Sequence, residues 1–528
     1  MEEVRKENNG RLIVLTASHI ELSDFHLNPF IAFTGGFPSG LFPKKILRKY
    51  WYPIAESNED GSAKFAPYGL RKVEALLKEE FGDENVVTCT PYNLEKFIGK
   101  NTKVIGISTM DPVGIGFVSR TYTSLLAFGK EPIAAAEFRD LITNQIIKNS
   151  NAKIIVGGSG AWQIKRAGLQ DAYGIDTLTI GESESIVIDI FRKAVNNEQL
   201  PKVIETEKPK LEEIPLIKEA SLFGVVEITR GCGKGCQFCS PTMRSRHDFP
   251  LDKIKKEAEL NANAGAKMIT LQTDDIFIYR CKSGFVPNRE AIVELIKTIY
   301  EIPNVEYIQI AHASLPPVVY DPKMIEEIAP MLVEKARWRN NGKKIACSEI
   351  GIETGSIRLL EKYMKGKSLP YEPKDWHEVV TQGLGIFNDN DIYPLATLLM
   401  GLPEESEEDA LATMELLDKM KHLKLFYVPL LFTSEEESLL NKARQADLKD
   451  LKDIHWDFIA TCWRRNINEW ALKDKWKIML GALFAYYFYY RWKHGNRVFK
   501  PILKLSGYPE SLFCTHTSTG LKLSRAHG

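Results

Sequence analysis

Between positions 11 and 200, apolar residues alternate between short β-branched runs and stretches with helical spacing. Helices are predicted at Pro67–Phe81 and Phe138–Asn149, where apolar residues recur every three or four positions. The predicted strands are Leu12–Thr16, Val86–Thr90, Lys103–Ser108, Lys153–Gly157 and Thr177–Ile180. Strands separated by helices predict an α/β fold with a doubly wound, Rossmann-like parallel sheet over residues 1–200.

A charged stretch with three prolines at residues 201–220 is predicted to be a linker, and a second alternating segment opens after it. Its predicted strands are Val225–Thr229, Met268–Thr273, Tyr307–Ala313, Ile345–Thr354, Tyr393–Met400 and Leu425–Phe432. Its predicted helices are Lys253–Ala264, Arg289–Tyr300, Lys323–Arg337, Asp375–Asn388 and Glu408–Lys421. Residues 221–434 are therefore expected to form a second α/β domain.

Bulk composition narrows the class of protein. The 528 residues exceed one typical domain. Lys plus Arg and Asp plus Glu both total 69, and this balance argues against a nucleic-acid partner bound through its phosphates. The N-terminus lacks the apolar stretch of a signal peptide, and no apolar run reaches the roughly 18–20 residues that span a bilayer. A cytoplasmic protein is expected.

Three cysteines, Cys232, Cys236 and Cys239, lie in the run GCGKGCQFCSP with the spacing C-x3-C-x2-C. Three thiolates in one short loop can hold three corners of a [4Fe–4S] cube and leave the fourth iron open. The glycines between them allow a tight curl with backbone N–H groups near the sulfurs. A zinc loop and chance structural thiols are the alternatives, but zinc sites usually show two pairs of ligands.

This cysteine run resembles that of the radical S-adenosylmethionine (SAM) superfamily. In that family the open iron is chelated by the amine and carboxylate of SAM. The resemblance implies a partial (β/α)6 barrel with the cysteine loop after its first strand. It also implies reductive cleavage of SAM to a 5′-deoxyadenosyl radical. The electron then comes from a low-potential donor such as ferredoxin or flavodoxin.

Polar residues end the remaining predicted strands, where barrel active sites lie. The resemblance implies SAM-binding roles for most of them and makes His312 the candidate catalytic residue. The candidate cofactor-binding residues are Asp274, Asp275, Gln309, Glu353, Ser356, Gly401 and Arg244, the last from the end of the cysteine loop. The alternative for each single turn is ordinary helix capping by acidic residues. For His312 the alternative is a hydrogen-bonded structural histidine.

The turns STMDPVGIG, VGGSGAW and IGESES of the first segment resemble the cobalamin-binding domain of B12-type radical SAM proteins. The resemblance covers most of residues 85–190. Its candidate cofactor-binding residues are Gly157, Gly158, Gly181 and Glu182. One feature departs from the family, because Asp111 is followed by Pro112 and no histidine stands in that turn to ligate cobalt. Cobalamin binding and a scaffold-only role both stay open.

Residues 435–528 are predicted to be a mostly helical C-terminal segment that faces substrate or membrane. Between Trp456 and Trp492 the chain is rich in aromatic residues, and cations flank the apolar run Ile478–Tyr490. Such a stretch suits peripheral contact with lipid headgroups or the wall of a greasy tunnel. The alternative is a buried helix packed on the barrel. An auxiliary cluster is a further alternative for the scattered Cys89, Cys281, Cys347, Cys462 and Cys514.

The whole layout resembles the radical SAM group that acts on isoprenoid and other lipid skeletons. It predicts an apolar, lipid-like substrate and C–C bond formation, most like cyclopentane-ring formation in archaeal tetraether lipids. The alternative is a cobalamin-dependent C-methyltransferase acting on a lipid or peptide carbon. A product that gains a methyl group favours the methyltransferase, and a product two hydrogens lighter favours cyclisation.

Overall fold

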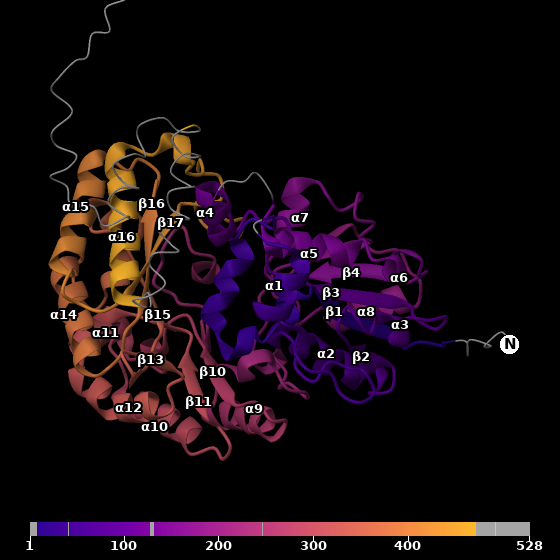
Figure 1. Ribbon diagram of the computed structural model, residues 1–528. Helices are drawn as coiled ribbons and strands as arrows, with labels where there is room; N and C mark the ends of the chain where they lie inside the picture. The colour runs from indigo at the N-terminus through magenta and orange to yellow at the C-terminus, as the bar shows by residue number, and fades with distance from the viewer. Residues whose placement is uncertain (1–7, 41, 127–130, 245, 471–491, 493–528) are drawn as a thin grey trace, which may run out of the picture.

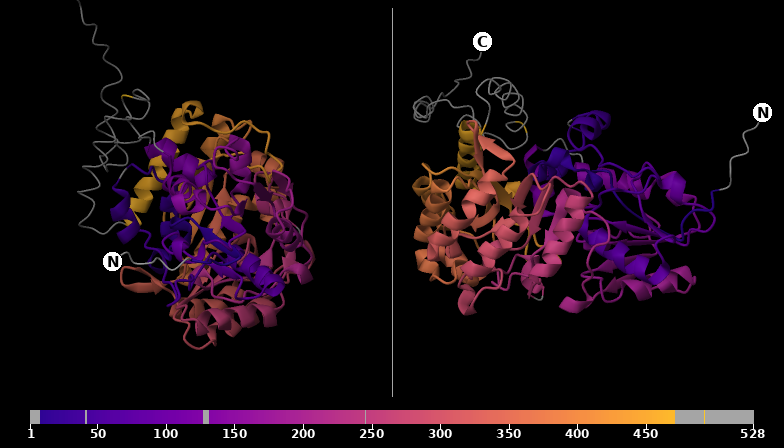
Figure 2. Two further views of the ribbon diagram at one scale, coloured as in Figure 1. Left: turned by 90° about the vertical axis from the view of Figure 1, so that its right-hand side faces the viewer. Right: turned by 90° about the horizontal axis from the view of Figure 1, so that it is seen from below.

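Two α/β halves lie side by side in the computed structural model, which describes residues 8–40, 42–126, 131–244, 246–470 and 492. The first half runs from indigo to purple and the second from pink to yellow (Figure 1). The view from below shows the same separation (Figure 2). The chain therefore has the two parallel-sheet segments that its hydrophobic pattern predicts.

The first half is a six-stranded parallel sheet in the order β2-β1-β3-β4-β5-β6. Its strands are β1 (Ile13–Ala17), β2 (Val86–Thr88), β3 (Val104–Ser108), β4 (Lys153–Gly157), β5 (Thr177–Ile180) and β6 (Val203–Glu205). One face packs on α2 (Tyr68–Phe81) and α8 (Val187–Val195). The other packs on α3 (Leu94–Phe97), α5 (Ile133–Ile142), α6 (Gln145–Lys148) and α7 (Ala161–Ala167). Helices on both faces explain why the strands are apolar throughout.

The structure has further helices in this half, among them α4 (Phe117–Leu126), α7 and α8, and it changes two of the expected elements. The helix expected over Phe138–Asn149 is two helices, because Asn144 breaks it and its side chain accepts the Ile146 N–H to cap α6. The expected linker 201–220 contains β6, whose residues Val203 and Ile204 pair with β5. A short β-branched run is thus enough to extend the sheet despite its charged neighbours.

The second half holds two parallel sheets, β11-β10-β7 and β12-β15-β16-β17. They meet at Ala311, whose N–H donates to Leu271 and whose carbonyl accepts from Glu349, so the six strand positions run on in one parallel series. The strands are β7 (Val225–Glu227), β10 (Met268–Gln272), β11 (Tyr307–Ile310), β12 (His312–Ala313), β15 (Glu349–Glu353), β16 (Leu395–Met400) and β17 (Phe426–Leu431). This is the strand order that a partial (β/α)6 barrel requires.

Helices and two small hairpins complete the second half. The helices between the strands are α9 (Leu251–Asn263), α10 (Arg289–Tyr300), α11 (Leu315–Tyr320), α12 (Pro322–Glu334), α13 (Ile357–Tyr363), α14 (Trp376–Asp389) and α15 (Glu407–Lys419). The hairpins pair β8 (Thr229–Arg230) with β9 (His247–Asp248), and β13 (Trp338–Asn340) with β14 (Lys343–Ile345). The single helix expected at Lys323–Arg337 is preceded by α11, a separate helix that begins after Ser314.

Two helices join distant parts of the chain. Helix α16 (Asp453–Trp470) buries Trp456, Phe458 and Cys462 in the barrel core. The start of the expected C-terminal segment is therefore a helix packed on the barrel. Helix α4 (Phe117–Leu126) of the first half reaches β17, where Thr121 Oγ1 accepts the Leu431 N–H at 2.9 Å. The remaining helix, α1 (Lys44–Tyr50), belongs to the first half.

The apolar run Ile478–Tyr490 and its flanking cations lie outside the described residues. None of the helices in the described ranges has the length and apolar character needed to cross a bilayer.

Candidate active site between the sheet and the cysteine loop

The cysteine loop, residues 231–246, leaves the barrel at the carboxyl end of its first strand. Strands β8 and β9 pair antiparallel at its two ends and close its base. Inside the loop, the Gln237 N–H donates to the Tyr363 carbonyl at 2.9 Å, and the Gln237 carbonyl accepts from Leu440 at 3.0 Å. The loop is thus held from two sides by segments far away in the sequence.

The three thiols are half-buried and lie close enough for their charges to act on one another. Burial raises the pKa of Cys232 to about 11. Burial, and then repulsion from the other two thiolates, raises the pKa of Cys239 well above its ordinary value. Burial likewise raises the pKa of Cys236. Three thiolates in such a place need a bound positive charge, which an iron–sulfur core supplies.

The three cysteines suit a [4Fe–4S] cluster by their number and by their spacing along one loop. Each sulfur on such a cube binds a different iron, and three thiolates leave the fourth iron open.

Two lysines, the buried Lys234 and the largely buried Lys367, flank the thiols, and sequence reasoning missed both. Lys234 donates to Asp275 Oδ2 at 2.7 Å and to Ser314 Oγ at 2.9 Å. Lys367 pairs with Glu353 Oε1 at 3.3 Å, and its ammonium acts on both Cys236 and Cys239. The place of Lys234 inside the cysteine motif could have identified it from the sequence. The sequence KGKS around Lys367 matches no motif that would identify this lysine.

Asp274 and His312 follow β10 and β11 and lie near each other at the ends of these strands. Burial raises the pKa of Asp274, and Arg244 and His312 act against that shift. His312 Nδ1 lies 3.1 Å from the Thr273 carbonyl, while Nε2 lies 3.5 Å from Glu349 Oε2. The carbonyl partner fixes the ring so that Nε2 faces the Glu349 carboxylate.

Glu353 also lies at the mouth, with its backbone in the left-handed region at φ 65°. Its carboxylate accepts from Lys367 and, at 3.3 Å, from Thr397 Oγ1. Strained backbone of this kind persists where the surrounding structure holds it, often at functional sites.

Other predicted site residues are engaged in structural bonds. Asp275 is held by Lys234 and Ser314, so it anchors the cysteine loop. Gln309 is buried, its amide donates to the Cys347 carbonyl at 2.7 Å, and its oxygen accepts from Trp338 at 2.9 Å. The polar atoms of these two side chains are thus already hydrogen-bonded to neighbouring groups of the protein.

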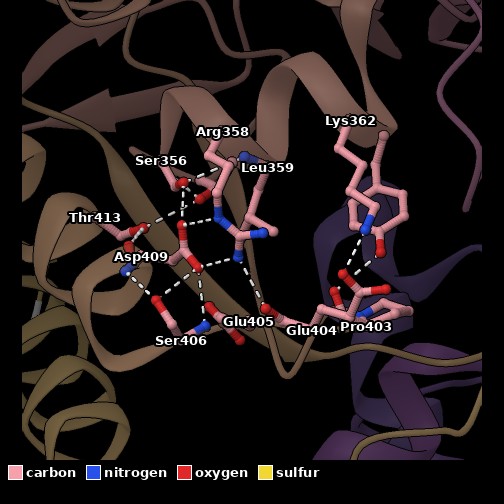
Figure 3. A network of polar contacts seen from close by, with 12 residues as sticks. Ser356, Arg358, Leu359, Lys362, Pro403, Glu404, Glu405, Ser406, Asp409 and Thr413 are labelled. Atoms are coloured by element: carbon pink, nitrogen blue, oxygen red, sulfur yellow. Dashed lines mark hydrogen bonds and ion pairs between the residues drawn. The ribbon is translucent and has the colours of Figure 1, made fainter.

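The turns after β15 and β16 are closed by their own helix caps (Figure 3). Ser356 caps α13 by accepting the Leu359 N–H at 3.2 Å, and its hydroxyl donates to Asp409. Asp409 also pairs with Arg358 and forms a capping box with Ser406 at the start of α15. The Gly401 N–H donates to Glu405. Capping, the alternative for these turns, therefore accounts for Ser356, while Gly401 is held by a bond within its own turn.

A cavity of about 550 Å³ opens between the carboxyl ends of β3, β4 and β5 and the base of the cysteine loop. The predicted Gly157, Gly158, Gly181 and Glu182 all line it, and so does Arg244. Its inner part is apolar and lies between the sheet and helices α2 and α8. That part is lined by Leu15, Leu70, Val73, Ile155, Val187 and Phe191.

Arg230, directly before the cysteine motif, joins the two sides of this cavity. Its guanidinium donates to Glu182 at 2.9 Å and to Glu184 at 2.8 Å, both in the turn after β5. It also holds Glu227 of β7 through two bonds. The turn after β5 and the root of the cysteine loop are therefore one ion-paired unit.

The scattered cysteines Cys89, Cys281 and Cys347 each have separate surroundings. Burial raises the pKa of Cys89 and Cys347 to about 12, as expected for apolar structural thiols. Cys281 Sγ accepts from Arg246 at 3.2 Å. Cys514 lies outside the described part of the chain.

Comparison with known proteins agrees with the cysteine motif. Residues 226–417 match the model of the radical SAM superfamily. A tRNA-2-methylthio-N(6)-dimethylallyladenosine synthase of Nitrosospira multiformis is 24% identical over 293 residues, 53% of this chain and 57% of that protein. A ribosomal protein uS12 methylthiotransferase RimO of a Sulfurihydrogenibium species is 25% identical over 267 residues, 50% of this chain. The latter match spans 53% of that protein's length, so each alignment covers little more than half of its relative.

Solved structures share the fold over a longer stretch. The radical SAM methyltransferase TsrM of Kitasatospora setae, with tryptophan and a SAM analogue, superposes with a TM-score of 0.52 at 14% identity. The superposition covers 80% of this chain and 74% of the TsrM chain. TsrM with cobalamin and a [4Fe–4S] cluster gives the same score at 13% identity, with 82% and 74% covered. The α/β fold of this chain is thus similar to that of TsrM over most of its length.

Proposed function

Taking residues 226–417 as a radical SAM domain that uses a [4Fe–4S] cluster and SAM, we propose that this protein is a cobalamin-dependent methyltransferase. The observation that carries the proposal is the cavity between the sheet ends and the cysteine loop. Its position is where parallel α/β sheets bind ligands. Formation of a lipid ring, expected from the sequence, finds no support in the relatives, which are named for methylthio and methyl transfer.

The residues that line the cavity have the chemistry that cobalamin binding needs. Its apolar inner part between the sheet, α2 and α8 accepts a flat aromatic arm, and its mouth carries Glu182, Glu184 and Arg230. Carboxylates at the mouth accept hydrogen bonds from the amide-bearing rim of such a cofactor. Asp111 holds the Gly116 N–H and the Ser119 hydroxyl, so the turn after β3 is shaped by its own bonds and supplies no cobalt ligand.

Residues of this chain divide the remaining tasks. Cys232, Cys236 and Cys239 hold the cluster, and SAM is bound at the iron that they leave open. When bound, cobalamin supplies a methyl carrier between SAM and a carbon that is a poor nucleophile. His312 is fixed with Nε2 toward Glu349, a geometry that lets the pair hold a proton at the barrel mouth.

The substrate class is wider than the lipid expected from the sequence. The matched relatives are named for tRNA and for a ribosomal protein, so the neutral net charge does not exclude RNA. Transfer of a labelled methyl group from SAM into RNA, protein or lipid fractions of the native host tests each class. The added mass separates methyl from methylthio transfer, and a ring-forming enzyme transfers no label.

Cobalamin loading is the direct test of the proposal. Ser159 and Asn151 are both exposed and lie just beyond opposite ends of β4, but only Ser159 lines the cavity. After anaerobic reconstitution with iron, sulfide and cobalamin, we expect Ser159→Trp to bind several-fold less cobalt than Asn151→Trp, with equal iron in both. Cys236→Ala is expected to lose iron and 5′-deoxyadenosine formation. Absence of cobalt from the parent protein, or equal cobalt in the two Trp variants, would overturn the proposal.

A further inference from the structure

Lys367 is a buried cation that the motifs leave unexplained. It lies in the turn after α13, and its side chain is only 14% exposed. An ion with so little access to water needs close partners. Its charge partner is Glu353 Oε1, 3.3 Å away at the end of β15.

The backbone at Gly351 fixes where this pair lies. A Cβ atom placed on Gly351 would stand 2.2 Å from Glu353 Oε1 and 2.7 Å from Lys367 Nζ. The carboxylate and the ammonium therefore lie directly over this glycine. Thr397 of β16 binds the same carboxylate, which keeps Glu353 on the strand side of the pair.

The turn that carries Lys367 packs tightly on the cysteine loop, since a Cβ on Gly366 would stand 2.0 Å from the Lys234 carbonyl oxygen. The charge of Lys367 acts on both Cys236 and Cys239. A positive charge therefore lies within electrostatic reach of two of the three cysteines.

A cluster with three thiolate ligands becomes more negative when one electron enters it. In a site of low dielectric, a nearby cation stabilises the reduced form more than the oxidised form. Net charge around the cluster is one of the protein's means of setting its potential.

We propose that Lys367 sets the potential of the [4Fe–4S] cluster, its buried ammonium raising that potential so that a single electron from an external low-potential donor reduces the cluster. This inference rests on the cluster of the radical SAM domain and is independent of cobalamin. It predicts opposite effects from the two members of the ion pair, since Glu353 partly cancels the ammonium.

The test is a redox titration of the reconstituted protein followed by electron paramagnetic resonance, without SAM. Lys367→Met is expected to shift the midpoint to more negative potential, while Lys367→Arg stays near the parent. Glu353→Gln is expected to shift it to more positive potential. Lys365→Met is the matched control, because Lys365 is exposed in the same turn, and it leaves the midpoint unchanged.

Iron and sulfide counts accompany each titration so that only fully loaded protein is compared. An unchanged midpoint in loaded Lys367→Met overturns the proposal, as does a shift of the same sign in Glu353→Gln. If Lys367→Met loads no cluster, Glu353→Gln and Lys367→Arg still decide the sign. Weaker SAM binding with an unchanged midpoint would assign Lys367 to SAM instead.

Discussion

Glu21 shows how one ionisable side chain shapes the sheet edge. It follows β1, and its carboxylate accepts the Met110 N–H at 2.6 Å and the Thr109 hydroxyl at 3.3 Å. These bonds tie it to the turn after β3. Burial raises the pKa of Glu21 to about 7, although those hydrogen bonds oppose the shift.

This shift predicts a pH dependence of stability. The raised pKa means that the folded protein keeps a proton which the unfolded chain releases above about pH 4.5. The contribution of Glu21 to the unfolding free energy therefore falls as pH rises from about 4.5 to about 7, and it is fully lost above that range. Glu21→Gln should be stabilised relative to the parent at pH 8 by on the order of 3 kcal/mol more than at pH 4. Urea unfolding at both pH values measures this, and a difference independent of pH would contradict it.

At the residue scale, the sequence identifies groups whose chemistry has a characteristic spacing. The three cysteines stand in one loop, and Asp274 and His312 follow neighbouring strands, so their roles stay predictions that the structure permits. Ser356 and Gln309 occupy equally suggestive positions, yet neighbours claim their polar atoms. The hydrogen-bond partner of a side chain depends on tertiary contacts, and a local sequence pattern does not reveal these.

Among elements, the turn after α13 supports the cysteine loop. Tyr363 accepts the Gln237 N–H, and Gly366 lies against the Lys234 backbone. Helix α13 and this turn were absent from the expected elements. Their apolar run is short, so too few apolar residues recur at helical spacing for the sequence to predict a helix there.

Substituting Gly366 tests this support. In Gly366→Ala, the methyl group would overlap the Lys234 carbonyl, so the cysteine loop must move. We expect a loss of stability of about 1–3 kcal/mol and several-fold less iron after reconstitution. Gly385→Ala is the control, since that helical glycine has nothing within 4 Å. Parent-level iron in Gly366→Ala would show that the turn does not hold the loop.

Elements with a regular pattern of apolar residues have boundaries close to those predicted from the sequence. Strands β4 and β5 and helix α10 have the predicted boundaries. Strand β6 was missed because its three residues stand in a charged stretch, and only the edge of β5 makes them a strand. Short elements of this kind are stabilised by a neighbour rather than by their own composition.

Across the whole molecule, buried ion pairs join the two halves. Lys72 of α2 pairs with Glu257 of α9 at 2.7 Å, and both side chains are only 4% exposed. Tyr68 donates to the same carboxylate at 2.7 Å. The sequence predicts both helices but not this contact between them.

Breaking this pair should be costly, whereas replacing both members should not. Lys72→Met leaves Glu257 with an uncompensated buried charge, and we expect a loss of about 3–5 kcal/mol. Lys72→Met combined with Glu257→Leu should recover much of it, since no charge then remains buried. Chemical unfolding of the four proteins of this double-mutant cycle gives the coupling. Additive losses would contradict a direct pair.

Arg230 links the contact between the two halves to the cysteine motif. Its guanidinium binds Glu182 and Glu184 of the first half and stands two positions before the first cysteine. A separation of the halves breaks these ion pairs while each sheet keeps its own hydrogen bonds. We therefore expect the root of the cysteine loop to loosen before either half unfolds.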